Sequence, residues 1–199
     1  SWPRPEVLAT HSGGYLSCEH TPHKERRHSR ATQDNRSVKL RIPGPITFAA
    51  ISGVGLACAA APWNYHWLAW PAAALMCYAM LTAPTPPAAF MRGFSAGVAY
   101  HMILLHWLLT NVFWAGGWAI PGWILLCMAL STYWGLFAMA WTWLRQRIPC
   151  LPLWLTAPLL WAAMEHLQGI LFTGFGWCWL GYTQSVCEST RQLASVGGV

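Results

Sequence analysis

The sequence predicts an all-α protein, a polytopic bundle of transmembrane helices with about five spans. Of the 199 residues, 55% are hydrophobic and only 9% are charged, whereas a soluble globular chain is about 25% charged. No charged residue lies between Arg41 and Arg92 or between Arg92 and Arg145. Each of these two stretches is long enough for two spans of about 20 residues. This composition excludes an ordinary cytosolic enzyme, a disordered protein and a nucleic-acid-binding protein with a basic face.

Five apolar stretches are each expected to form one span, and a sixth span begins at the end of the sequence: 46–61, 67–81, 93–114, 123–144, 153–172 and 193–199. Pro62 ends the first stretch, and a turn at 84–87 follows the second. We expect Gly116, Gly117 and Pro121 to break the chain between the third and fourth, because proline and glycine interrupt helices.

Small residues four positions apart predict surfaces for close helix packing. The pairs are Ala49 with Gly53, Gly55 with Ala59, and Gly93 with Gly97. Small side chains let helices approach closely in lipid, where the hydrophobic effect does not drive association.

The basic residues predict the orientation. With the N-terminus in the cytoplasm, the cytoplasmic loops are 1–45, 82–92 and 145–152, and these hold eleven of the twelve Lys and Arg residues. Short cytoplasmic loops are enriched in Lys and Arg. An odd number of spans then places the chain from Leu171 onward on the outer side.

Two domains are expected: a disordered basic cytoplasmic tail, 1–41, and a transmembrane bundle, 42–199, truncated at its C-terminal end. The tail is too poor in aliphatic residues to bury an apolar core. An alternative use of its Cys18, His20, His23 and His28 as zinc ligands lacks a second Cys at a zinc-finger spacing. Another alternative is weak adhesion of the basic residues near Lys39 to anionic lipid.

The remaining cysteines and histidines leave two further alternatives open. The cysteines fit small buried hydrophobic residues, but Cys178 and Cys187 lie on the predicted outer side, where a disulfide is possible. His101 and His166 are a possible pair of haem ligands, although polar residues within spans are usually satisfied by neighbours. We expect no metal and no cofactor.

Glu165 lies about two thirds of the way along the fifth span, where a carboxylate is costly. It therefore either accepts a hydrogen bond from another helix or lines a lipid or substrate cleft. The residues that follow it, 171–184, are rich in Trp, Phe and Gly. Aromatic residues collect where a helix meets the lipid headgroups, so this stretch is expected to be an irregular segment at the outer interface.

The order of motifs around Glu165 resembles the bacterial apolipoprotein N-acyltransferases. The matching stretches are LWAAMEHLQG at 160–169, FTGFGW at 172–177 and GYTQ at 181–184, with looser matches at 61–65, 90–94 and 116–121. Gln168 stands where that family usually has Arg, and Gly176 where it usually has Pro. The first departure puts a charge-dependent headgroup contact at position 168 in doubt.

The resemblance implies a multi-pass enzyme of the bacterial inner membrane that matures lipoproteins. In that family, a cysteine of a nitrilase-like αββα domain takes an acyl chain from a phospholipid as a thioester and passes it to the diacylglyceryl-cysteine of an apolipoprotein. A Glu acts as the base and a Lys stabilises the oxyanion.

That nitrilase-like domain is absent from these 199 residues, so we expect a fragment that contains no catalytic residue and is inactive by itself. The candidates to shape a lipid cleft are Glu165, Gln168, Phe172, Trp177, Tyr182 and Gln184. The alternatives are a membrane transporter, a haem-binding membrane protein and a purely structural membrane module.

Overall fold

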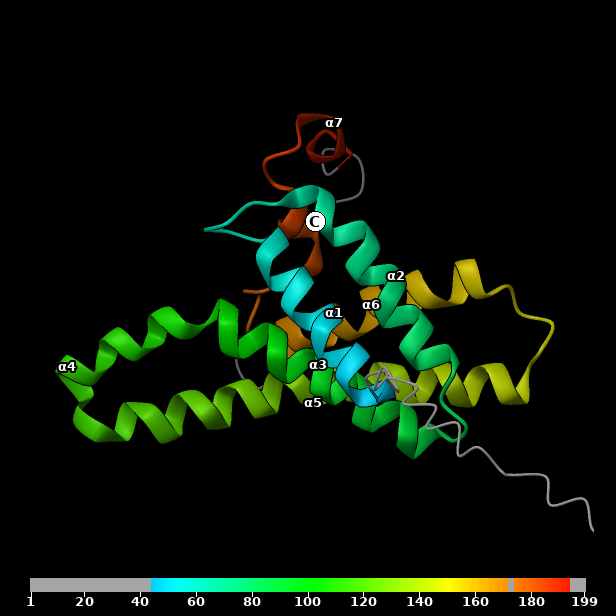
Figure 1. Ribbon diagram of the computed structural model, residues 1–199, viewed down its shortest axis with the longest axis horizontal. Coiled ribbons are helices and arrows are strands. Elements are labelled where there is room, and N and C mark those ends of the chain that lie inside the picture. Colours follow the sequence, from blue (N-terminus) through cyan, green and yellow to red (C-terminus); the bar gives the residue numbers. More distant parts are fainter. Residues whose placement is uncertain (1–43, 172–173, 194–199) are drawn as a thin grey trace, which may run out of the picture. The chain divides into compact units, whose positions relative to one another are not determined.

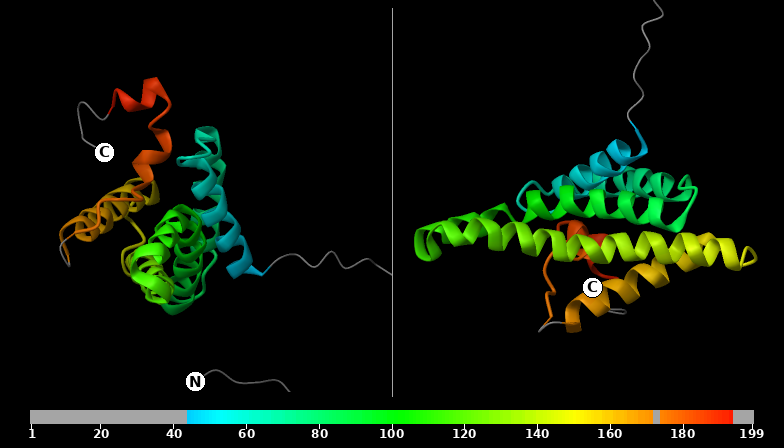
Figure 2. Two further views of the ribbon diagram at one scale, coloured as in Figure 1. Left: turned by 90° about the vertical axis from the view of Figure 1, so that its left-hand side faces the viewer. Right: turned by 90° about the horizontal axis from the view of Figure 1, so that it is seen from below.

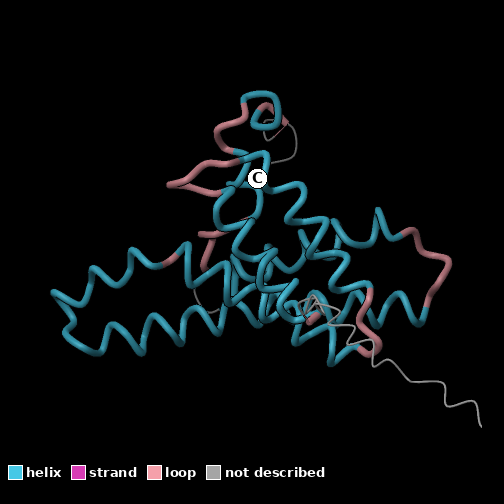
Figure 3. The backbone as a smooth tube through the Cα atoms, viewed as in Figure 1, coloured by secondary structure: helices cyan, strands magenta, loops and turns pink. Residues whose placement is uncertain are grey.

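The computed structural model describes residues 44–171 and 174–193, and the expectations for the 1–41 tail, for Phe172 and for a sixth span lie outside these ranges. Every regular element in them is a helix, as Figure 3 shows, which confirms the all-α prediction for this part of the chain. One helical stretch there, His106–Arg147, is long and apolar enough to cross a membrane; the apolar helix Pro45–Ala59 is shorter.

Six helices of the bundle follow one another along the sequence (Figure 1). They are α1 (Pro45–Ala59), α2 (Ala69–Leu81), α3 (Pro86–Leu104), α4 (Val112–Ala115), α5 (Ala119–Arg147) and α6 (Leu153–Ile170). Short 3₁₀ turns η1 (His66–Leu68), η2 (His106–Asn111) and η3 (Gly116–Trp118) connect some of them, and η5 (Leu180–Gln184) and α7 (Glu188–Arg191) follow α6.

The predicted ends of two helices were wrong, because prolines that were taken as breaks lie in first turns. Pro86 and Pro87 begin α3, seven residues before the predicted start, and the Thr85 side chain accepts a hydrogen bond from the Ala88 N–H at 3.4 Å. Helix α5 starts at Ala119 and includes Pro121. A first-turn N–H has no partner within its helix, so proline is tolerated there.

The predicted third span is also divided. Helix α3 ends at Leu104, and η2 and α4 continue the chain. Together with η3 and the start of α5 they form a hairpin that extends away from α1, α2 and α6 (Figure 1). Gly116 adopts a φ of +62° in its turn, a conformation that glycine tolerates best. Phe113 and Trp114 are both 92% exposed there.

Helix α3 packs between α1 and α5, while α2 packs against α1 and α6 against α5 (Figure 2). A Cβ atom at Gly53 of α1 would clash with the carbonyl of Ala96 in α3, and one at Gly93 of α3 would lie 2.5 Å from the carbonyl oxygen of Trp134 in α5. Glycine therefore sets the spacing of both helix pairs, in agreement with the small-residue pattern.

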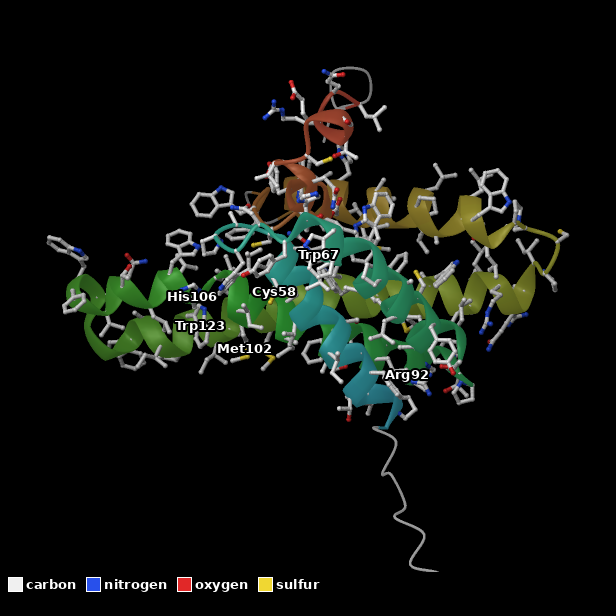
Figure 4. The ribbon with its side chains drawn as sticks, turned by 45° about the horizontal axis from the view of Figure 1, so that its top comes forward. Cys58, Trp67, Arg92, Met102, His106 and Trp123 are labelled. Carbon is white, nitrogen blue, oxygen red and sulfur yellow. The ribbon has the colours of Figure 1, made fainter. Side chains whose placement is uncertain are left out.

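Arg92 is buried near the start of α3, at the end opposite to His106 (Figure 4). Its Nη1 donates hydrogen bonds to the Ala79 carbonyl at 2.6 Å and to Thr82 Oγ1 at 2.9 Å. A cation there satisfies a carbonyl of the last turn of α2 and interacts favourably with its dipole. Arg92 thereby ties the start of α3 to the end of α2.

Candidate functional site

The segment of residues 174–185 crosses the end of the bundle at which α1, α3 and α6 finish and α2 begins. Its neighbours there are the ends of α1 and α3, at 60–62 and 104–107, and η1. Four side chains connect the backbone of this segment to the rest of the bundle by hydrogen bonds. Two of them belong to α6, one belongs to α3, and one belongs to the segment itself.

Two backbone hydrogen bonds join the start of this segment to the end of α6. The Phe175 N–H donates to the Gln168 carbonyl at 2.9 Å, and the Gly174 N–H donates to that of Leu171 at 2.8 Å. Gly174 has a φ of +77°, and a Cβ atom there would clash with the Gly169 carbonyl. Only glycine fits this position without a shift of the backbone.

Gln168, on the last turns of α6, holds the first half of the segment. Its side chain is 4% exposed, and its Nε2 donates to the carbonyls of Phe175 at 3.2 Å and of Trp177 at 3.5 Å. The side chain therefore binds backbone. Its hydrogen-bond partners in the structure are carbonyl oxygens, for which an amide N–H is sufficient.

Glu165, one turn before Gln168 on α6, holds the second half of the segment. Its Oε1 accepts a hydrogen bond from the Leu180 N–H at 2.6 Å. Both alternatives for Glu165 have a counterpart in the structure: the side chain accepts a hydrogen bond, from the backbone at the start of η5, and it also lines a cavity between α2 and α6. Glu165 and Gln168 together give α6 an acceptor and a donor that match the backbone of the 174–185 segment.

Two further bonds attach the segment to distant parts of the chain. The Tyr100 hydroxyl of α3 donates to the Cys178 carbonyl at 3.1 Å, and Gln184 Nε2 donates to the His66 carbonyl of η1 at 3.0 Å. Cys178 has a φ of +68°, a strained conformation for a non-glycine residue that surrounding contacts must maintain.

The cysteines in the described ranges are free thiols, so the alternative of a disulfide between Cys178 and Cys187 is wrong. Burial raises the pKa of the Cys178 thiol to about 12. Since the thiolate is the nucleophilic form, Cys178 is unsuited to nucleophilic chemistry near neutral pH.

The histidines considered as haem ligands lie in different surroundings. His101 is fully buried beside the rings of Tyr100 and Trp134. Its Nδ1 lies 3.2 Å from Ser131 Oγ. The Ser131 hydroxyl donates a hydrogen bond to the Cys127 carbonyl at 2.6 Å. His166 is exposed on α6. In the part of the chain that the structure describes, no three His, Cys, Asp or Glu side chains gather as metal ligands would.

Two apolar cavities border the 174–185 segment. The first, of about 640 Å³, lies against the ends of α1 and α3 and is lined by Trp177, Cys178, Tyr182 and Ser185. The rings of Trp107 and Trp177 lie 5.1 Å apart beside it. The second, of about 610 Å³, lies between α2 and α6 and is lined by Leu180, Gly181, Thr183 and Gln184.

The structure thus divides the predicted cleft residues among three environments. Trp177 and Tyr182 line the first cavity, whereas Glu165 and Gln184 line the second. Gln168 lines neither, and Phe172 lies outside the described residues. Tyr100 and His66 were not predicted to contact this segment, because a single Tyr in an apolar helix and a backbone carbonyl leave no signal in the sequence.

Comparison with known proteins gives one consistent family. Residues 52–199 match the family described as the apolipoprotein N-acyltransferase N-terminal domain. The chain is 29% identical over 163 residues to the apolipoprotein N-acyltransferase of Vibrio vulnificus, covering 80% of this chain and 32% of that protein. It is 32% identical over 162 residues to the one of Azotobacter vinelandii, covering 79% and 31%. The chain spans about a third of the length of the curated relatives it matches. It belongs to the apolipoprotein N-acyltransferase family and corresponds to the N-terminal domain of that family.

Proposed function

We propose that this chain is the membrane part of an apolipoprotein N-acyltransferase of the bacterial inner membrane. That enzyme transfers an acyl chain from a phospholipid to the N-terminal S-diacylglyceryl-cysteine of a lipoprotein. The observation that carries the proposal is the first cavity: an apolar space of about 640 Å³ at one end of the bundle, next to Trp177 and Tyr182, in a chain of this family.

The surface of the helices supports a location in the membrane. Large apolar side chains are exposed along the bundle, among them Trp154 at 78% and Leu125 at 71%. Soluble monomers rarely expose extended apolar surface. Helix α5 has 29 residues, a length of about 43 Å, which exceeds the roughly 30 Å of hydrocarbon in a bilayer.

The charges support a polytopic arrangement with the 174–185 segment on the outer side. Arg145 and Arg147 lie in the last turn of α5, and Arg92 lies near the start of α3. Lys and Arg favour the cytoplasmic side. The 174–185 segment lies at the other end of α3, near Leu104 and Leu105, and would therefore face the outer side.

In this proposal the chain binds and orients lipid, and the chemistry belongs to a domain beyond these residues. A thiolate nucleophile of that domain would attack the phospholipid ester and release the lysophospholipid, and the acceptor amine would then attack the resulting thioester, form the amide and release the thiol. The first cavity would hold an acyl chain while the ester lies near the bundle end. Holding the reacting groups in position is a large part of what a protein can contribute to such a transfer.

The test uses the full-length protein that contains this chain, in vesicles, with transfer to a diacylglyceryl-cysteine lipopeptide followed by mass spectrometry. Trp177→Ala enlarges the first cavity and should lower kcat/KM at least tenfold. Trp154→Ala, which removes an exposed Trp from the other end of α6, should leave kcat/KM within twofold. Equal rates for Trp177→Ala and the unaltered protein would place the cleft elsewhere.

A further inference from the structure

Trp177, which lines the first cavity, is placed by the backbone beside it and not by burial of its own ring. The indole is 56% exposed, and its ring neighbours are Phe175 at 5.9 Å and Trp107 at 5.1 Å. The Trp177 carbonyl lies 3.5 Å from Gln168 Nε2, which is longer than an ordinary hydrogen bond. The direction in which the indole points therefore depends on the next residue, Cys178.

Cys178 has a backbone conformation that its own side chain disfavours. Its φ is +68°, a region in which the Cβ atom of an L-residue is crowded against a carbonyl oxygen. The ordinary conformations all have a φ below about −50°. Relaxation to one of them would turn the chain by more than about 100° around the N–Cα bond of Cys178. Trp177 lies on one side of that bond and the Cys178 carbonyl on the other, so the turn would displace the indole from the cavity wall.

We propose that the Tyr100 hydroxyl holds Cys178 in this conformation, so that Tyr100 is a positioning residue for Trp177 in the wall of the first cavity. The hydroxyl donates to the Cys178 carbonyl at 3.1 Å. Tyr100 itself does not line the cavity, so it acts through the backbone alone. This inference rests on the proposed function, in which the first cavity holds an acyl chain.

The Tyr100 hydroxyl is a rigidly placed donor. The side chain is fully buried, and its ring stacks on Trp134 of α5 at 4.9 Å and meets His101 edge-on at 5.2 Å. These ring contacts remain when the hydroxyl is removed, so Tyr100→Phe removes the hydrogen bond and keeps the packing of α3 against α5. A buried hydrogen bond and a left-handed non-glycine residue have free energies of the same order. Loss of the bond is therefore sufficient to let Cys178 relax.

The neighbouring contacts direct this relaxation to Trp177. After Cys178, the Leu180 N–H is bound to Glu165 of α6 at 2.6 Å. Before Cys178, the nearest short hydrogen bond is that of the Phe175 N–H to the Gln168 carbonyl at 2.9 Å. Positions 176 and 177 lie between these two attachments, so a change in the φ of Cys178 is taken up there.

The test first follows the indole by fluorine NMR of the full-length protein that contains this chain, labelled with fluorotryptophan in detergent micelles. The Trp177 line is assigned by its absence in Trp177→Phe. We expect Tyr100→Phe to shift this line, because the indole loses its contact with Trp107. The line of Trp154, in the first turn of α6, should not move, which shows that the bundle is folded. Tyr78→Phe removes an exposed hydroxyl from α2 and should move neither line.

Substitutions at Cys178 separate the proposed cause from a loss of packing. Glycine adopts a positive φ freely, so Tyr100→Phe should leave the Trp177 line in place when it is combined with Cys178→Gly. Cys178→Ala also removes the thiol but keeps the Cβ atom, so the shift should persist in that background. In the lipopeptide transfer assay, Tyr100→Phe should lower kcat/KM about fivefold in the Cys178→Ala background, the effect of one buried hydrogen bond. In the Cys178→Gly background it should lower kcat/KM by less than about twofold.

Two results would overturn the inference. One is an unshifted Trp177 line in Tyr100→Phe. The other is an equal shift in the Cys178→Gly and Cys178→Ala backgrounds, which would mean that the hydroxyl acts by another route. The NMR measurement requires no acyl transfer, so a shift with its rescue in a protein without transfer would refute the proposed function alone. An unshifted line in an active protein would refute the role of Tyr100 alone.

Discussion

Glu165→Leu should release the second half of the 174–185 segment without unfolding the bundle. The change removes the acceptor of the Leu180 N–H, which is bound at 2.6 Å. A hydrogen bond to a charged group contributes about 1.5–3 kcal/mol, so the free energy of local opening should fall by about 2 kcal/mol. The Leu180 amide should then exchange with solvent roughly 30-fold faster, because each 1.4 kcal/mol is a factor of ten.

The assay is hydrogen–deuterium exchange of the protein in vesicles, read by mass spectrometry for peptides from the 174–185 segment and from α3. Glu165→Gln keeps a neutral acceptor and should accelerate exchange less than Glu165→Leu. Glu188→Leu removes an exposed carboxylate from α7 and serves as the control for the loss of charge. Unchanged exchange at Leu180 in Glu165→Leu, or an equal increase in α3, would refute this account of Glu165.

Three further predictions concern packing, capping and thiol reactivity. Gly53→Ala should lower the free energy of unfolding by about 1–3 kcal/mol, because the added methyl group overpacks the contact with α3. Gly122 has open space around it, so Gly122→Ala should not lower the free energy of unfolding. Thermal unfolding in detergent compares the two variants. Arg92→Met should cost about 2 kcal/mol in the same assay, since it leaves the last turn of α2 without its buried donor. Hydrogen bonds from Thr190 lower the pKa of Cys187, so maleimide should label Cys187 near neutral pH. Thr190→Val should shift the pH dependence of this labelling to higher pH. The same pH dependence in Thr190→Val and the unaltered protein would contradict the assigned cause.

The sequence was sufficient to locate the long helices α1, α2, α3, α5 and α6, because long apolar stretches are easy to recognise. It was less informative about their ends. Pro86 and Pro121 were taken as breaks, although a proline in the first turn of a helix is compatible with it. A pattern of charges and prolines contains no information about which of these two roles a proline has.

The candidate site was predicted in part. Glu165 and Gln168 were recognised as unusual polar residues in an apolar helix, and both contact the segment that follows. Their partners are backbone groups, which every residue type offers, so no pattern identifies them. The division of the predicted cleft into two cavities depends on Tyr100 and His66, whose bonds to the segment join residues 78 and 118 positions apart.

Those two long-range bonds have a consequence for biogenesis. Chains are made from the N-terminus, and domains generally fold in that order, so α1, α2 and α3 exist before the 174–185 segment is translated. Until then, the Tyr100 hydroxyl and the His66 carbonyl lack their native partners, and neither cavity has its lining from this segment. Ribosome-bound chains arrested before and after Gln184 has emerged should therefore differ in protease resistance at the ends of α1 and α3.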